Sequence, residues 1–385
     1  MTFLHLGNGA AIPYRYLSRH VGIFGATGTG KSVTLGAIAE RAPCPILIFD
    51  AKGDLESLAS TLIRPAMRID AMGADLLARA LDLSEAQAGA LQIALAWAED
   101  CNRGVATLAD LRCLLNDALQ HDLSGAYGLI SPISVAAVQR ALLRLERHSP
   151  WTFTASTFDP RDTAGIAVYA AAELASVPGL YGAFAAHVLD SLYRGLGEVG
   201  DVAAPGLLVM IDEAHLIFDG ASPSIVRRIE QITRLIRSKG VGLVYVTQSP
   251  SDLPAAIAGQ LATRIQHALR ASTPQHLKAL KAAAETMPGN IAAADILGLG
   301  TGQAIVSIPD AAGKPLPGRC VAIQRGKVAL HGVGLPEPVQ PARAPMAADE
   351  PIPEPSAPMP RPWWRYAVWT AAALWGLVLI GHALP

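Results

Sequence analysis

The chain has few charged residues, almost no net charge and no paired cysteines. Only 16% of its 385 residues are charged and 51% are hydrophobic, which excludes a chain that is disordered throughout. Lysine and arginine number 31 and aspartate and glutamate 32, for a formal net charge of −1. This balance gives no sign of a nucleic-acid partner, so any contact with DNA needs local basic patches.

The cysteines argue against a zinc site or a disulfide framework. They lie far apart, with no CxxC pair and no histidine at metal-ligand spacing, at positions Cys44, Cys101, Cys113 and Cys320. We expect reduced thiols in a cytosolic protein. Residues 1–19 contain charges and no long apolar run, so no signal peptide is expected there.

The C-terminal residues differ from the rest in composition. Residues 335–362 hold 10 of the 28 prolines, which predicts a semi-extended linker. Residues 366–385 contain no Asp, Glu, Lys or Arg, and as a helix they would span about 30 Å, the thickness of a bilayer core. Aromatic residues and two arginines lie at the entry to this run. Residues 363–385 therefore predict a transmembrane tail helix that anchors a cytoplasmic body to the inner membrane. The alternative is an alanine-rich helix docked on the domain.

Apolar strands alternate with helical patterns along the rest of the chain, as in a parallel α/β sheet. The strand-like runs are residues 21–24, 46–49, 165–169, 207–211, 242–247, 264–269 and 303–308. Residues 71–149 instead show only helical patterns, with start signals at Ser84, Thr107 and Ser131. We predict a core domain of residues 1–70 and 150–334, interrupted by a helical insertion at 71–149.

A glycine-rich segment, GATGTGKS, follows the first strand and precedes a helix. It fits G-x-x-x-x-G-K-[ST] in full, in the strand–loop–helix context of a phosphate-binding loop. Its glycines let backbone N–H groups point at a phosphate, and the helix N-terminus adds a positive dipole end. Lys31 can reach the β- and γ-phosphates of ATP, and the Ser32 hydroxyl can bind Mg²⁺. The residues expected to bind the nucleotide are Gly25, Ala26, Thr27, Gly28, Thr29, Gly30, Lys31, Ser32 and Val33.

A second motif, LLVMIDEAH, places two acidic residues directly after a fully apolar strand. Such a strand suits a sheet buried on both faces, and ligands bind at the carboxyl ends of its strands. Asp212 is expected to hold Mg²⁺ and Glu213 to polarise the attacking water. A strand at 165–169 and a helix at 180–196 separate the two motifs in the sequence. This intervening strand, with a Glu beside the Asp, is typical of P-loop ATPases that use a catalytic glutamate.

The letters DEAH do not make the chain an RNA helicase, because no other motif of those two-lobed enzymes is present. His215 is therefore expected to be a packing or polar-network residue. A basic amphipathic helix is predicted at 222–240, its cations forming a solvated face that favours the helix dipole. The strand after it ends at Gln248, which can contact the γ-phosphate.

Together these segments resemble the HerA/FtsK group of ring ATPases, and most closely the HerA-like helicases of the YjgR type. The resemblance covers about residues 5–330 and includes FDAKGDL at 49–55, MIDEAHLIFD at 210–219 and RLIRSKGVGLVYVTQSPSDLP at 234–254. It implies a RecA-like P-loop fold, a homohexamer with ATP sites between subunits, and DNA as a partner. Two features depart from the family: the N-terminal β-barrel of HerA is missing, and residues 335–385 replace a longer soluble region.

The resemblance also implies roles for particular residues. Gln248 matches the sensor, and Arg237 matches the arginine that related motors present to a neighbour's γ-phosphate. Arg234 and Arg264 are alternatives for that arginine. Asp50, which ends the second strand, is expected either to support the site or to shape a turn.

Three functions are consistent with this sequence. The first is a Mg²⁺-dependent ring ATPase that translocates or unwinds DNA. The second is a membrane-tethered ATPase that moves or remodels protein, as secretion coupling proteins do. The third is a scaffold that binds ATP and rarely hydrolyses it, and Glu213 argues against it because a switch needs no water-polarising carboxylate.

Overall fold

The computed structural model describes residues 3–333, apart from positions 8, 149–150, 155–157, 178, 222 and 311. Two compact units divide the chain, residues 1–335 and 336–385, and the fold below is that of the first. The predicted linker and tail helix lie outside the described residues. Within the described part, no helix has the length and apolar character needed to cross a membrane.

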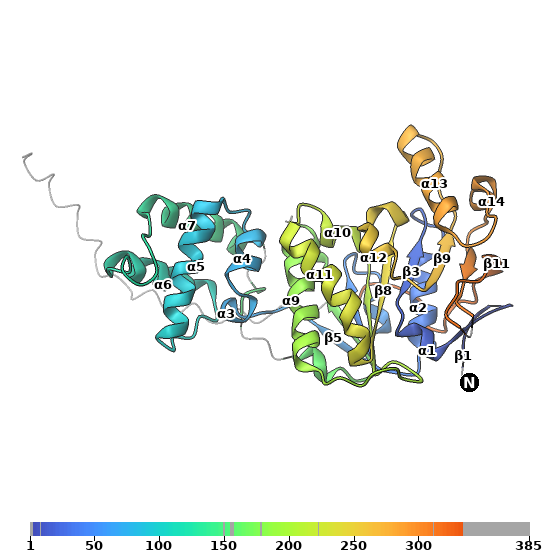
Figure 1. The fold of residues 1–385 in the computed structure, drawn as a ribbon, viewed down its shortest axis with the longest axis horizontal. Coiled ribbons are helices and arrows are strands. Elements are labelled where there is room, and N and C mark those ends of the chain that lie inside the picture. Colours follow the sequence, from blue (N-terminus) through green and yellow to red (C-terminus); the bar gives the residue numbers. More distant parts are fainter. Residues whose placement is uncertain are drawn as a thin grey trace, which may run out of the picture. The chain divides into compact units, whose positions relative to one another are not determined.

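A single sheet of nine strands, counted over the described residues, forms the centre of the fold (Figure 1). Its order is β11-β10-β9-β3-β8-β7-β4-β6-β5; the strands from β9 to β5 are parallel, and β10 and β11 are antiparallel. Their bounds are β3 (Val21–Phe24), β4 (Ile46–Asp50), β5 (Thr61–Ile63), β6 (Ile166–Ala170), β7 (Leu207–Ile211), β8 (Val241–Thr247), β9 (Thr263–His267), β10 (Gln303–Ser307) and β11 (Arg319–Ala322).

Each strand that an apolar run predicted is present, within two residues at either end. The sequence did not reveal β5, β11, or the separate hairpin of β1 (Phe3–Gly7) and β2 (Ala10–Pro13). A strand does lie between β3 and β7 in the sheet, as the predicted fold class requires, but it is not the strand that separates the two motifs in the sequence. In the sheet β8 lies between β3 and β7, whereas β6 lies on the far side of β4. Sequence order placed β6 between the motifs, but pairing in a parallel sheet does not follow sequence order.

Both faces of the sheet are covered, and this explains its continuous apolar runs. Along β7, Leu208 and Met210 belong to one hydrophobic cluster, and Val209 and Ile211 belong to the other. The first cluster contains residues of α2 (Lys31–Arg41) and α1 (Tyr14–Leu17). The second contains residues of α9 (Leu180–Gly195) and α11 (Pro223–Leu235).

Between β5 and β6 the described residues contain helices and no strand, as predicted. All three predicted start signals form, and at the third, Ser131 Oγ accepts from the Ile133 N–H at 3.2 Å. The Gln87 side chain accepts from the Ser84 backbone N–H at 3.0 Å, and Thr107 Oγ1 accepts from the Asp110 N–H at 3.1 Å. The helices are α3 (Ile69–Met72), α4 (Ala74–Ala80), α5 (Glu85–Asp100), α6 (Leu108–Gln120) and α7 (Pro132–His148).

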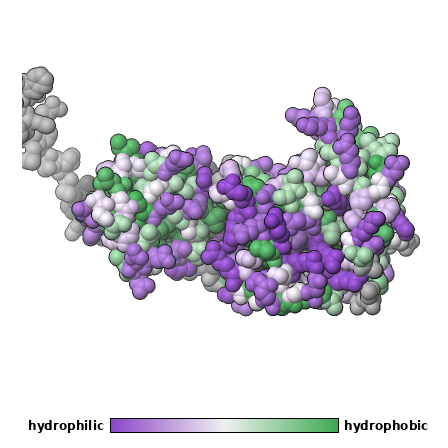
Figure 2. Space-filling view, viewed as in Figure 1, coloured by the Kyte–Doolittle hydropathy of each residue, from purple (hydrophilic) through white to green (hydrophobic). Residues whose placement is uncertain are grey.

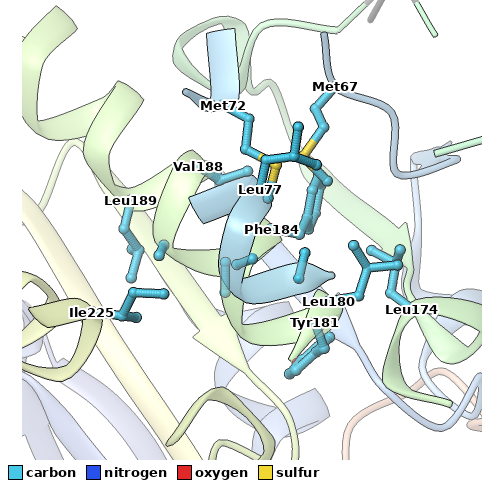
Figure 3. Packing of buried hydrophobic residues seen from close by; sticks show 14 of the residues in the cluster. Met67, Met72, Leu77, Leu174, Leu180, Tyr181, Phe184, Val188, Leu189 and Ile225 are labelled. Carbon is cyan, nitrogen blue, oxygen red and sulfur yellow. The ribbon is translucent and has the colours of Figure 1, made fainter. Parts of the chain in front are cut away.

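The insertion packs on the core through α9. Met72 and Leu77 of the insertion lie beside Phe184 and Val188 of α9, all of them buried (Figure 3). One hydrophobic cluster thus continues from the insertion into the second face of the sheet. The apolar sides of these helices are therefore used to attach the insertion to the sheet domain.

The remaining short elements connect the strands. They are α8 (Ala172–Ala175), α10 (His215–Phe218), α12 (Ala255–Ala258), α13 (Pro274–Thr286), α14 (Ala293–Leu297), η1 (Glu56–Leu58), η2 (Pro160–Asp162), η3 (Ile236–Lys239) and η4 (Pro250–Asp252). The helix predicted at 222–240 is α11 followed by the 3-10 turn η3, and it stops at Gly240, which adopts the left-handed region. Its four isoleucines are buried, and hydrophilic surface lies over this part of the molecule in Figure 2.

Candidate functional site

The glycine-rich loop joins β3 to α2 at the carboxyl end of the sheet. Gly25 N–H donates to the Gln248 carbonyl at 3.0 Å and Ala26 N–H to the Ala268 carbonyl at 2.8 Å, which fastens the loop to both neighbouring strands. Gly28 and Gly30 have φ of 81° and 117°. Glycine adopts this region at little cost, so the loop can curl around an anion with its N–H groups inward.

A buried histidine packs against the phosphate-binding loop. His267 lies against Gly25, where an added Cβ would be 2.5 Å from the histidine Cβ. Its Nε2 is 2.9 Å from Thr34 Oγ1 and its Nδ1 2.9 Å from the Gln303 carbonyl. Burial lowers the pKa of His267 to about 4, so the ring is neutral, donating through Nδ1 and accepting through Nε2. Sequence reasoning missed this residue, because no motif marks it.

Lys31 begins α2 and is 5% exposed. Its Nζ donates to the Gly25 carbonyl at 2.7 Å and the Ala26 carbonyl at 3.2 Å. Burial lowers its pKa, and the nearby carboxylate of Glu213 opposes that shift. The lysine of the loop and the acidic pair at the end of β7 are therefore close enough to interact.

Three carboxylates meet next to the loop. Oxygens of Asp50, Asp54 and Asp212 lie within 4.8 Å of one another, an arrangement that could hold a metal ion. Asp212 is 1% exposed, and its Oδ2 is buried with no hydrogen-bond partner. Ser32 Oγ donates to Asp54 Oδ2 at 3.3 Å, which brings the hydroxyl to the same place. Hard oxygen ligands of this kind suit Mg²⁺.

Burial raises the pKa of Asp212 to about 7, and the carboxylates of Glu213, Asp54 and Asp50 add to this rise while Lys52 opposes it. An unpartnered, buried carboxylate with so high a pKa is costly to ionise without a cation. The residues therefore fit a divalent metal at this position.

Glu213 follows Asp212 in an unusual backbone conformation. Its φ is 46°, in the left-handed region that few residues other than glycine adopt, and such strain gathers at functional sites. Its carboxylate forms an ion pair with Lys52 and lies 3.1 Å from His215 Nδ1. Burial raises the pKa of Glu213, but the hydrogen bonds from His215 and Lys52 outweigh it and lower the pKa to about 2.

His215 is part of a polar network, one of the two roles expected for it. Besides Glu213 it lies 3.5 Å from Thr247 Oγ1, which donates to Asp252 Oδ2 at 2.9 Å. The Glu213 hydrogen bond raises its pKa. His215 thus helps to fix the position of the acidic residue.

Asp50 shapes the turn after β4. It is fully buried, and its carboxylate accepts from the N–H groups of Lys52, Gly53 and Leu55. This turn carries Lys52 and Asp54 into the site. Both are functional candidates that sequence reasoning missed, although the segment DAKGD was the available signal.

Of the other predicted residues, Gln248 lies beside the loop and the three arginines do not contact it. Gln248 directly follows β8, next to the loop, with an exposed side chain. Arg237 lies in η3, before the N-terminal end of β8 and thus at the opposite end of the sheet from the loop, in an ion pair with Asp201. Arg234 is exposed. Arg264 donates to the carbonyls of Thr286 and Ala258, which commits it to its own subunit.

The chain is similar in fold to a bacterial conjugative coupling protein, TrwB, and to VirB4. The bacterial conjugative coupling protein TrwBΔN70 in complex with sulphate has a TM-score of 0.59 at 18% identity, covering 83% of this chain and 89% of that one. TrwB in complex with a non-hydrolysable ATP analogue has a TM-score of 0.60 at 18% identity, covering 87% and 92%. VirB4 of Thermoanaerobacter pseudethanolicus has a TM-score of 0.56 at 15% identity, covering 80% and 89%.

These likenesses confirm the RecA-like P-loop fold predicted from the sequence. No curated protein matches the chain. The sequence does match the family described as "Helicase HerA-like C-terminal", over residues 5–63 and 61–338. That match confirms the HerA-like resemblance. The chain therefore belongs to the Helicase HerA-like C-terminal family and is a P-loop ATPase.

Proposed function

We propose that this ATPase is a Mg²⁺-dependent, homohexameric motor that couples ATP hydrolysis to the movement of DNA. The observation that carries the proposal is the meeting of Lys31, Ser32, Asp212 and Glu213 at one edge of the sheet. Each group supplies one requirement of phosphoryl transfer to water: binding, metal coordination and activation of the nucleophile.

Binding begins at the loop. Its N–H groups and the N-terminus of α2 attract the β- and γ-phosphates. The Lys31 ammonium now donates to two loop carbonyls, and phosphate oxygens can replace those acceptors at little cost because the lysine is already held in place. The complex of TrwB with a non-hydrolysable ATP analogue supports nucleotide binding at this fold.

Ser32 and Asp212 would hold Mg²⁺, and Asp54 lies beside both. When bound there, Mg²⁺ would supply positive charge to offset the negative charge that develops on the phosphate. Asp212 Oδ2 has no hydrogen-bond partner among the described residues, so it is available as a ligand or as an acceptor for a metal-bound water. Asp50 is less available, since three backbone N–H groups occupy its carboxylate.

Glu213 would orient and polarise the attacking water. Its pKa near 2 keeps it ionised at neutral pH, and the contacts with His215 and Lys52 restrict its side chain. Gln248 follows β8, which is the neighbour of β7 in the sheet, and we propose that it contacts the γ-phosphate and that water.

A ring would supply the remaining cation. Arg237 lies at the opposite end of the sheet from its own loop, so it could act only on a neighbour's γ-phosphate. Arginines acting across an interface raise phosphoryl-transfer rates by about 10³ to 10⁵. We therefore expect Arg237→Ala to abolish turnover while nucleotide binding remains. Light scattering with and without ATP tests the ring, and a monomer in both conditions contradicts it.

DNA is the proposed substrate, in line with the helicase family. ATPase rates with and without duplex DNA, over a range of salt, test it. We expect stimulation that weakens as salt rises, because contacts to phosphates release counterions. If DNA does not stimulate hydrolysis and does not bind in a salt-dependent way, DNA is excluded as the substrate.

The alternative is a membrane-tethered ATPase that moves protein. Two observations favour this alternative: the similarity in fold to a conjugative coupling protein and the apolar run of residues 366–385. We propose that these residues anchor a cytoplasmic body to the inner membrane. Carbonate extraction of membranes tests the anchor, and release of the full chain into the soluble fraction contradicts it.

A further inference from the structure

The turn after β4 presents a second lysine to the site. Asp50 Oδ1 accepts from the N–H groups of Lys52 and Gly53, and its Oδ2 accepts from Leu55. Asp54 in the same turn accepts from Ser32 of the loop helix. The buried Asp50 carboxylate therefore fixes the backbone of Lys52. The hydrogen bond from Ser32 to Asp54 links the same turn to the phosphate-binding loop.

The Lys52 ammonium forms an ion pair with Glu213. The side chain of Glu213 is 7% exposed, but that of Lys52 is 36% exposed, so the lysine has space to change partners. Burial lowers its pKa, and Asp212 and Glu213 outweigh this and raise it, so Lys52 carries a positive charge at neutral pH. The positive charge of Lys52 also lowers the pKa of Lys31, so the two ammonium groups lie near each other at the site.

In the proposed reaction the γ-phosphate occupies the space between Lys31 and Glu213. A doubly charged phosphate group and an ionised carboxylate repel each other there, and the repulsion is strong because the surroundings are largely buried. The Lys52 ammonium, now paired with Glu213, can reduce that repulsion by moving to the phosphate. The same ion pair would also keep Glu213 from contacting water until the cation moves.

We propose that Lys52 is a second phosphate-binding residue that leaves Glu213 for the γ-phosphate, so that triphosphate binding frees the water-activating carboxylate. The proposal rests on the proposed function and adds a regulatory step to it. The site would thereby respond to the third phosphate. The Lys52–Glu213 ion pair stays in place when ADP binds, and a contact between Lys52 and the γ-phosphate replaces it when ATP binds.

A purely structural ion pair makes a different prediction. If Lys52 only compensates the charge of buried Glu213, its removal disturbs the site whichever nucleotide is present. A γ-phosphate contact is lost only when a third phosphate is bound. The ratio of triphosphate to diphosphate affinity therefore separates the two roles.

The test is binding of a non-hydrolysable ATP analogue and of ADP, each with Mg²⁺, to the full chain by calorimetry. We expect Lys52→Ala to weaken the analogue about tenfold, the size of one charged contact to phosphate, and to change ADP affinity less than twofold. Lys52→Arg should restore most of the preference, because it keeps the charge. Lys239→Ala is the matched control, since Lys239 is ion-paired with Glu198 outside the site.

Equal weakening of both ligands, or no change in either, would overturn the proposal, as would a failure of Lys52→Arg to restore the preference. Wild-type behaviour separates this outcome from failure of the proposed function. If the wild-type chain binds and hydrolyses ATP while Lys52→Ala shows no selective loss, only the exchange of partners is wrong. A wild-type chain that neither binds nor hydrolyses ATP contradicts the function itself.

Discussion

At the scale of single residues, Lys31 has the clearest expected effect. Its ammonium is buried and is held toward the loop by two carbonyls, so few other groups can take its place at a phosphate. We expect Lys31→Ala to reduce nucleotide affinity at least a hundredfold, measured by fluorescence of a labelled nucleotide. Lys281→Ala, on the exposed side of α13, is the control and should bind normally. Normal binding by Lys31→Ala would contradict the assignment of the loop.

Asp212 predicts how the site depends on pH. Its pKa of about 7 means that a proton competes with a metal ion below pH 7. The affinity of the site for Mg²⁺ should fall about tenfold from pH 8 to pH 6, since the ionised fraction of Asp212 falls by that factor. Glu213, with a pKa near 2, stays ionised over this range and adds no pH dependence. Calorimetric titration of the ADP complex with Mg²⁺ measures this affinity. The Asp212→Asn variant should bind Mg²⁺ weakly at both pH 8 and pH 6.

Which site residues a sequence reveals depends on whether neighbours in the chain are neighbours in the site. Lys31 and Ser32 are contiguous in one motif, as are Asp212 and Glu213, so pattern alone identified them. Lys52 and His267 act through partners far away in the sequence, Glu213 and Gly25. Their roles follow from sheet order, which the sequence did not provide.

At the scale of elements, the central strands β3, β4, β6, β7 and β8 were predictable because both faces of the sheet are buried there and each of these strands is an almost entirely apolar run. β5 has three residues and β11 has three of four exposed, so neither produces such a run. Helix starts were predictable where a side chain satisfies free N–H groups. The order of strands was not, because it depends on contacts between distant segments.

The insertion offers a test at this scale. Thr107 caps α6 through a hydrogen bond to the Asp110 N–H, and that helix buries five residues in the insertion. We expect Thr107→Ala to lower the free energy of unfolding by about 1 kcal/mol, measured by urea denaturation. Thr107→Ser keeps the oxygen and should lose little. Nucleotide affinity should not change in either variant, and a large change would mean that α6 communicates with the site.

At the scale of the whole molecule, a sheet domain carries the candidate ATP site at its carboxyl edge, and the helical insertion is attached to it through α9. In the proposed ring, Arg237, which lies at the opposite end of the sheet from its own loop, would act on a neighbour's site. Hydrolysis by the assembled chain should therefore depend on protein concentration, rising more steeply than in proportion as rings form. A rate strictly proportional to concentration, down to the lowest measurable level, would contradict cleavage shared between subunits.

The central claim is that ATP is cleaved where Lys31 meets Asp212 and Glu213. The most direct measurement is phosphate release by the full chain and by Glu213→Gln, with ATP affinity determined for both. We predict a wild-type rate that requires Mg²⁺, and a variant that binds ATP at least as tightly and releases phosphate at least a hundredfold more slowly. Hydrolysis by Glu213→Gln at the wild-type rate would contradict it.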